Sequence, residues 1–257
     1  MVQLVNFPKQ RRHTYYFLSQ ARNNAQVLLT TDIDMSSVES AKQQYNDEGQ
    51  TISYIVFLIK AISTVIKRYP RANSSLLEGW WPKIALYDSV IAKFVLDKVS
   101  ADERLVLSAV VKNSDSLAEG EIQKVINGYK SANYDNSPEF ENIRKLNSLP
   151  RFLGKYLYRY ILSNPLRRQV IQGSFTISSL GHRPVDAFFP ISSNTLAFGA
   201  GAIRQKVIAQ EGKPVVRAVM PLSMVFDHRV IDGAMAADIL DSIKKALESY
   251  RVDKGQC

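Results

Sequence analysis

The chain has 257 residues, of which 46% are hydrophobic and 22% charged, and this is enough to bury a full core as one domain of the larger α/β kind. Its single cysteine, Cys257, excludes an intrachain disulfide framework and favours a reducing cytoplasm. The formal charge of +9 indicates anionic partners. Nucleic acid is disfavoured among them, because no zinc-ligand spacing, helix-turn-helix signature or aromatic RNA-binding motif accompanies the charge.

The N-terminal part predicts alternating helices and strands. Arg11 and Arg12 open an amphipathic helix, residues 27–34 read as a strand, and residues 52–65 as a long buried helix. The apolar run 52–66 is too short to span a bilayer and is interrupted by Lys60, and the N-terminus lacks the pattern of a secretory signal. We therefore expect a soluble protein. Trp80 and Trp81 are expected to act as packing anchors.

The middle of the chain predicts a strand at 104–111, a helix at 116–129 and a further helical region between Pro150 and Pro165. In that region five residues at helical spacing form an aromatic and apolar face, namely Phe152, Leu153, Tyr156, Leu157 and Tyr160. Arg151, Lys155 and Arg159 form a basic row beside it. This helix either packs over the domain with a solvated basic face, or serves as a carrier-protein docking surface, a channel lid or an interfacial membrane helix.

The C-terminal third predicts a long strand over 213–226 and a helix in which apolar residues recur from Ile231 to Leu247. His228 and Asp232 lie four residues apart on the turn between them. A neutral histidine on such a rigid corner can take a proton from a thiol or hydroxyl near neutral pH. Upstream, Gly199 and Gly201 lack the third glycine and the lysine of a phosphate loop, so we expect them to permit close packing.

The turn Asp-His-Arg-x-x-Asp-Gly at 227–233 resembles the C-terminal signature of the dihydrolipoyl acyltransferases, the core enzymes of 2-oxoacid dehydrogenase complexes. It is also similar to the His-x-x-x-Asp-Gly of chloramphenicol acetyltransferase. A second match, Gly-Ser-Phe-Thr-Ile-Ser-Ser-Leu-Gly at 173–181, resembles the family's Gly-x-Phe-Thr-Ile-Ser-Asn-Leu-Gly, with Ser179 in place of asparagine. A weaker third match is Tyr-Pro-Arg-Ala-Asn at 69–73, after the N-terminal helix and strand order of the family.

The resemblance implies a chloramphenicol-acetyltransferase-like α/β fold, a two-layer sandwich with a mixed sheet flanked by helices. It implies a homotrimer with active sites between subunits. His228 would be the general base that deprotonates the thiol of coenzyme A, its second ring nitrogen held by the backbone. Ser178 of the neighbouring subunit would donate to the oxyanion of the tetrahedral intermediate. Asp232 would fix the loop through an ion pair, for which Arg12 is the candidate partner, although Arg12 could equally be a solvated charge.

The chain also departs from the family. No lipoyl domain with its modified lysine, Pro/Ala-rich linker or peripheral-subunit-binding domain is recognisable, so we expect a stand-alone catalytic domain over 1–257 without lipoyl attachment. The family's Gly-Leu-x-x-Pro-Val strand is replaced by 104–111, which lacks that glycine and proline, and this disfavours lipoamide. Residues from about 142 to 172 form a basic and aromatic insertion.

The implied reaction moves an acyl group between a pantetheine thioester, on coenzyme A or an acidic acyl carrier protein, and a second nucleophile such as a small-molecule amine or hydroxyl. No metal is expected. Condensation-domain-like amide formation on carrier-bound substrates is an alternative, although those domains carry His-His where this chain has Asp227-His228. A non-catalytic trimeric scaffold is a second alternative. A module that contacts a membrane surface or a carrier protein through 149–168 is a third.

Overall fold

A computed structural model describes residues 7–100 and 103–252, which form a mixed sheet and a separate hairpin. The sheet has the strand order β1-β9-β7-β6-β4-β5, with β8 also paired to β9. Its β4–β6 and β6–β7 pairs are parallel and the others antiparallel. The strands are β1 (Gln26–Asp34), β4 (Ala92–Ser100), β5 (Glu103–Val111), β6 (Phe175–Ser179), β7 (Leu196–Ala200), β8 (Arg204–Gln210) and β9 (Lys213–Asp227).

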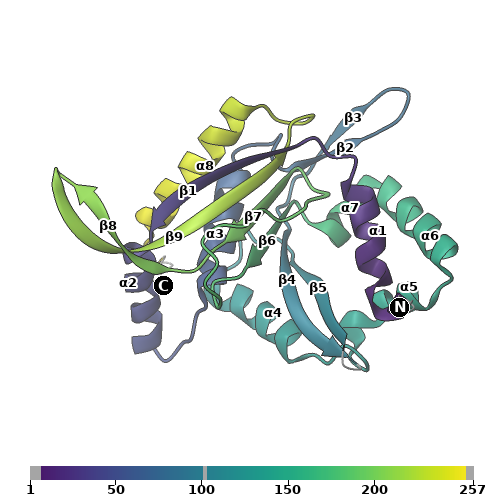
Figure 1. The fold of residues 1–257 in the computed structure, drawn as a ribbon, viewed down its shortest axis with the longest axis horizontal. Helices are drawn as coiled ribbons and strands as arrows, with labels where there is room; N and C mark the ends of the chain where they lie inside the picture. Colours follow the sequence, from purple (N-terminus) through teal and green to yellow (C-terminus); the bar gives the residue numbers. More distant parts are fainter. Residues whose placement is uncertain (1–6, 101–102, 253–257) are drawn as a thin grey trace, which may run out of the picture.

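Helices α2, α3, α4 and α8 form a layer on one face of this sheet (Figure 1). Helix α3 is apolar and buried on nearly every side, as expected for a helix enclosed by other elements. The predicted mixed α/β sandwich is therefore confirmed. The helices are α1 (Arg12–Ala21), α2 (Ser36–Asp47), α3 (Tyr54–Ile66), α4 (Glu119–Ser131), α5 (Glu141–Ser148), α6 (Arg151–Ser163), α7 (Pro165–Gln172) and α8 (Gly233–Glu248), with short 3-10 turns at Lys9–Arg11 and Pro138–Phe140.

Strand β9 connects the two halves of the sheet. Its first half pairs with β8 in a hairpin that projects from the domain, at the left of Figure 1. Its second half lies between β1 and β7, where Asp227 pairs with Gln26 and Phe226 pairs with Leu196. This half is buried throughout, in agreement with the continuous apolar run that predicted the strand.

The hairpin of β2 (Ser74–Leu77) and β3 (Lys83–Leu86) lies outside the main sheet. Trp80 and Trp81 occupy its turn and are 99% and 85% exposed. The prediction that they act as packing anchors was wrong, because the turn carries them away from the packed layers of this chain.

The predicted insertion consists of α5, α6 and α7. Helices α5 and α6 lie beside α1, and α7 packs against α6 (Figure 1). Pro150 and Pro165 flank α6, as the sequence predicted. Helix α6 packs through Gly154 and Leu162, while its aromatic face is open: Tyr156 and Tyr160 are 70% and 68% exposed. Peripheral membrane contact through 149–168 stays a prediction. Across the described residues, no helix has the length and apolarity needed to cross a bilayer.

Lys93 is a buried cation on β4, with only 7% of its surface exposed. Its Nζ lies 5.0 Å from the centroid of the Phe17 ring, and no carboxylate in the described chain pairs with it. Burial lowers the pKa of Lys93 from 10.5 to about 8. The charged form is therefore disfavoured in the folded protein.

We predict that this burial makes the free energy of unfolding depend on alkaline pH. Below pH 8 Lys93 is protonated in both the folded and the unfolded protein, so the full free-energy cost of burying its charge is present. Between about 8 and 10.5 the unfolded state binds a proton that the folded state has lost, so stability rises with pH. Lys93→Met should stabilise the protein at pH 7 by up to about 3 kcal/mol and abolish this rise. Urea unfolding at pH 7 to 10.5 measures the stabilisation and its pH dependence, with Lys83→Met as the exposed control. Free energies of unfolding that change in parallel with pH for wild type and Lys93→Met would contradict the prediction.

Candidate active site

The turn that carries the predicted base is held by the backbone of Asp227. The Asp227 N–H donates to the carbonyl of Thr195 at 3.0 Å, and its own carbonyl accepts from the N–H groups of Val230 and Ile231 at 3.0 and 3.3 Å. The N–H of His228 donates to the carbonyl of Ala25 at 2.8 Å. Backbone groups from three separate segments therefore fix the position of His228.

The Asp227 side chain also stabilises this turn. It is 4% exposed and accepts a bidentate bond from Arg229, whose Nε and Nη2 lie 2.9 and 2.6 Å from its Oδ1 and Oδ2. Arg229 also donates to Glu78 at 2.6 Å and to Asn24 at 3.1 Å. These bonds, chiefly that to Asp227, raise the pKa of Arg229. This pair was not predicted, although an aspartate and an arginine two residues apart on a turn could have indicated it.

The His228 ring is exposed and lies beside the Phe226 ring, with 5.6 Å between ring centroids. Neither ring nitrogen has a hydrogen-bond partner in the described part of the chain, so the predicted backbone bond that would select one tautomer is absent there. Both nitrogens are free to exchange a proton with a bound group.

Ser178 lies near the end of β6 and is half-buried. It pairs with Gly199 of β7, which in turn pairs with Ser223 of β9. A Cβ on Gly199 would lie 2.2 Å from the Phe188 carbonyl oxygen and 2.6 Å from Ser223 Oγ, so glycine is required for this close packing, as predicted. The Ser178 hydroxyl has no partner within the described chain and can donate to a bound group.

The strand register separates Ser178 from His228 within one chain. Ser178 is level with Ser223 two strands away, and His228 follows Ser223 by five residues along β9. With strands about 4.8 Å apart and a rise of about 3.4 Å per residue, the two Cα atoms are on the order of 20 Å apart. A hydroxyl and an imidazole must both lie within about 3 Å of the reacting atoms. One chain alone therefore cannot assemble these two groups around a substrate.

Asp232 and Arg12, predicted to form an ion pair, are not brought together. Asp232 is the N-cap of α8, and its Oδ1 accepts from the Met235 N–H at 2.8 Å. Arg12 donates instead to the carbonyls of Asn147 and Leu149, at 3.2 and 2.8 Å. The predicted ion pair does not form because the first turn of a helix offers backbone N–H donors to the Asp232 carboxylate. Arg12 instead faces the carbonyl groups at the end of α5.

We predict that Asp232 acts on stability through its cap. Asp232→Ala should lower the free energy of unfolding by about 1 kcal/mol, because the Met235 N–H loses its acceptor, whereas Asp232→Asn should cost only a few tenths, since asparagine caps as well as aspartate does. Thermal or urea unfolding of both variants measures the difference. A loss from Asn as large as that from Ala would show that the negative charge matters, in which case the ion pair would have to be reconsidered.

Comparison with known proteins places these residues in a family. The family described as 2-oxoacid dehydrogenases acyltransferase (catalytic domain) matches residues 2–145 and 163–252. The unmatched stretch, 146–162, lies inside the predicted insertion and includes nearly all of α6.

Individual proteins agree with this match. The chain is 27% identical, over 86% of its length and 44% of the relative's, to the dihydrolipoyllysine-residue acetyltransferase component of the pyruvate dehydrogenase complex of Bacillus subtilis. The chain thus spans about half the length of the curated relatives it matches.

Solved structures share the fold. A probable dihydrolipoamide acetyltransferase from Listeria monocytogenes superposes with a TM-score of 0.72 at 18% identity, covering 99% of this chain and 98% of that one. The dihydrolipoamide acetyltransferase of Azotobacter vinelandii, in which the catalytic roles of a serine, a histidine and an asparagine were investigated, superposes with a TM-score of 0.72 at 24% identity, covering 98% and 93%.

Proposed function

Because the chain belongs to the 2-oxoacid dehydrogenase acyltransferase family, we propose that it moves an acyl group between a pantetheine thioester and a second nucleophile. The observation that carries this proposal is His228, an exposed imidazole on a turn fixed by Asp227 and lying in the family's signature. Coenzyme A is the proposed thiol carrier, as donor in one direction and acceptor in the other.

In the proposed mechanism, an unprotonated ring nitrogen of His228 takes the proton from the attacking nucleophile. The nucleophile bonds to the thioester carbonyl carbon, whose π electrons move to oxygen. The Ser178 hydroxyl, which has no hydrogen-bond partner among the described residues, donates to this oxyanion. When the carbonyl re-forms, the carbon–sulfur bond breaks, and His228 returns its proton to the departing thiolate.

We propose that His228 and Ser178 come from two copies of the chain, in a homotrimer. The separation on the order of 20 Å set by the β6–β7–β9 register supports this, because a Ser178 hydroxyl can reach the histidine only from a second copy. A ring of three equivalent copies gives each histidine one neighbour's serine. The Azotobacter enzyme supports the choice of residues, since the asparagine investigated there follows its histidine by four positions, as Asp232 follows His228.

The acceptor is proposed to be a small-molecule amine or hydroxyl, because the 104–111 strand lacks the glycine and proline of the lipoamide side of the family's channel.

Two alternative functions make different predictions. Condensation-like amide formation would require a carrier-bound donor, and a non-catalytic scaffold would show no turnover. An exposed histidine and a half-buried serine, whose side chains have no hydrogen-bond partner in the described part of the chain, favour catalysis over the scaffold.

The test is turnover with a panel of acyl-coenzyme A donors and acceptors that includes amines, alcohols and dihydrolipoamide, followed by release of free thiol. His228→Ala should abolish turnover, because it removes the base that the proposed mechanism requires. Ser178→Ala should reduce kcat about 100-fold or more through loss of one oxyanion donor.

Ser179→Ala, at the neighbouring exposed position of β6, is the matched control and should stay near wild type. Thiol release that is equal in wild type and His228→Ala would refute the proposed mechanism. A preference for dihydrolipoamide would correct the proposed acceptor and leave the roles of His228 and Ser178 intact.

A further inference from the structure

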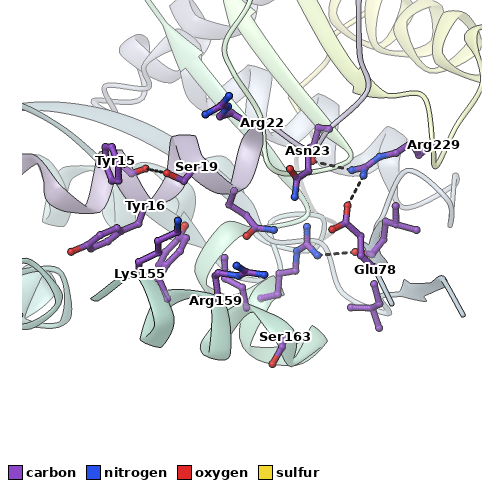
Figure 2. A pocket seen from close by; sticks show the side chains of 17 residues that line it. Tyr15, Tyr16, Ser19, Arg22, Asn23, Glu78, Lys155, Arg159, Ser163 and Arg229 are labelled. Carbon is purple, nitrogen blue, oxygen red and sulfur yellow. Dashed lines mark hydrogen bonds and ion pairs between the residues drawn. The ribbon is translucent and has the colours of Figure 1, made fainter. Parts of the chain in front are cut away.

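A basic pocket of about 680 Å³ opens beside the turn that carries His228. It lies between α1 on one side and α6 on the other, with the β2–β3 turn and Arg229 at one end (Figure 2). Arg229 lines the pocket and directly follows His228, so the pocket extends to the turn that carries the proposed base, while His228 itself is not among the lining residues. A pocket of this volume accommodates a nucleotide-sized ligand.

The lining carries five cations and one carboxylate: Arg22, Lys155, Arg159, Arg168, Arg229 and Glu78. Glu78 is already paired with Arg229, as the dashed line in Figure 2 shows. Arg22, Lys155 and Arg159 have no acidic partner among the described residues. Unpaired like charges that converge on one cavity repel one another and create a strongly positive potential. The pocket is therefore complementary to an anion that carries several charges.

Part of this basic lining is rigid. Arg168 donates to the carbonyls of Leu76 and Ser193 at 2.8 and 3.2 Å, and burial lowers its pKa. Helix α6 is held against α1 by Gly154, where an added Cβ would lie 2.5 Å from the hydroxyl oxygen of Tyr16. This contact leaves Lys155 and Arg159, on the neighbouring face of α6, directed toward the pocket in Figure 2.

We propose that this pocket binds the diphosphate of the coenzyme A substrate, with Lys155 and Arg159 of the insertion as phosphate-binding residues. The inference rests on the proposed function and deepens it, since it names the donor and the residues that recognise it. Guanidinium groups bind phosphate oxygens in pairs, and ammonium groups add a point charge. Stretch 146–162 lies outside the family match, so this part of the site belongs to the chain's own insertion.

The number of cations in the pocket distinguishes coenzyme A from a phosphopantetheine arm as the phosphate-bearing ligand. A phosphopantetheine arm on a carrier protein brings one phosphate, whereas coenzyme A brings a diphosphate and a third phosphate on its ribose. Four cations remain after the pairing of Arg229 with Asp227 and Glu78, and one phosphate would leave most of them uncompensated. The balance of charge favours coenzyme A.

The experiment is isothermal titration of the intact protein with coenzyme A, phosphopantetheine, pantetheine and inorganic pyrophosphate. The test variant is Lys155→Gln/Arg159→Gln. The control is Arg151→Gln/Arg167→Gln, which removes the same charge from exposed positions of α6 and α7 that do not line this pocket. Melting temperatures check that both variants fold.

The test variant should bind coenzyme A and pyrophosphate about tenfold more weakly, through the loss of two partly exposed ionic contacts, whereas the control should bind as wild type does. Pantetheine binding should not change, and phosphopantetheine should bind more weakly than coenzyme A to wild type.

Equal losses of coenzyme A affinity in the test and control variants, or no loss in either, would overturn the assignment of Lys155 and Arg159. Tighter binding of phosphopantetheine than of coenzyme A would overturn the choice of donor. Pyrophosphate binding requires no acyl transfer. Loss of pyrophosphate affinity in a protein without turnover would therefore refute the proposed function alone. His228-dependent turnover with unchanged affinity would refute the pocket alone.

Discussion

The hydrogen-bond register of β9 determines what this chain can do by itself. The strand is paired with β8 along its first half and with β1 and β7 along its second, so it cannot slide by even two residues without breaking three ladders. The same register sets Ser178 level with Ser223 and places His228 five residues farther along. The two side chains proposed for acyl transfer are thereby held on the order of 20 Å apart in one chain, and neither has a hydrogen-bond partner among the described residues.

The turn after β9 holds His228 in place through contacts within one chain. If His228 acts with a serine of another copy, as proposed, contacts within its own chain must fix its position. The buried carboxylate of Asp227 achieves this, because it binds both the backbone and the guanidinium of Arg229. Arg229 then connects the turn to Glu78 of the β2–β3 turn and to the basic pocket. Residues of the insertion and of the turn that carries the proposed base therefore line one pocket, in which five cations face one carboxylate among the described residues.

The elements around the site were predictable because their signals are local. Strand β9 and helix α8 follow from unbroken apolar patterns, and the position of His228 between them follows from where those patterns stop. Long-range pairings were not predictable from sequence alone. Arg12 was assigned to Asp232, although Asp232 caps its own helix and Arg12 binds carbonyls at the end of α5. The partner of a charged side chain depends on how distant elements pack, which periodicity does not contain.

Exposure was the other property that the sequence did not determine. Trp80 and Trp81 look like core residues by type, yet they lie at a hairpin turn in solvent. The aromatic face of α6 was correctly recognised as a stripe, but the stripe alone does not show whether it faces the domain or the outside. The structure shows that the buried contacts of α6 are made by Gly154 and Leu162 instead.

The central claim is that catalysis needs His228 from one copy and Ser178 from another, and subunit complementation tests it directly. His228→Ala and Ser178→Ala chains would be purified, mixed under conditions that exchange subunits, and assayed for thiol release. Random mixing should regenerate about one quarter of wild-type activity, because one in four sites then pairs an intact histidine with an intact serine. Activity in the mixture no higher than the sum of the separate variants, with exchange verified by mass, would contradict a site shared between copies.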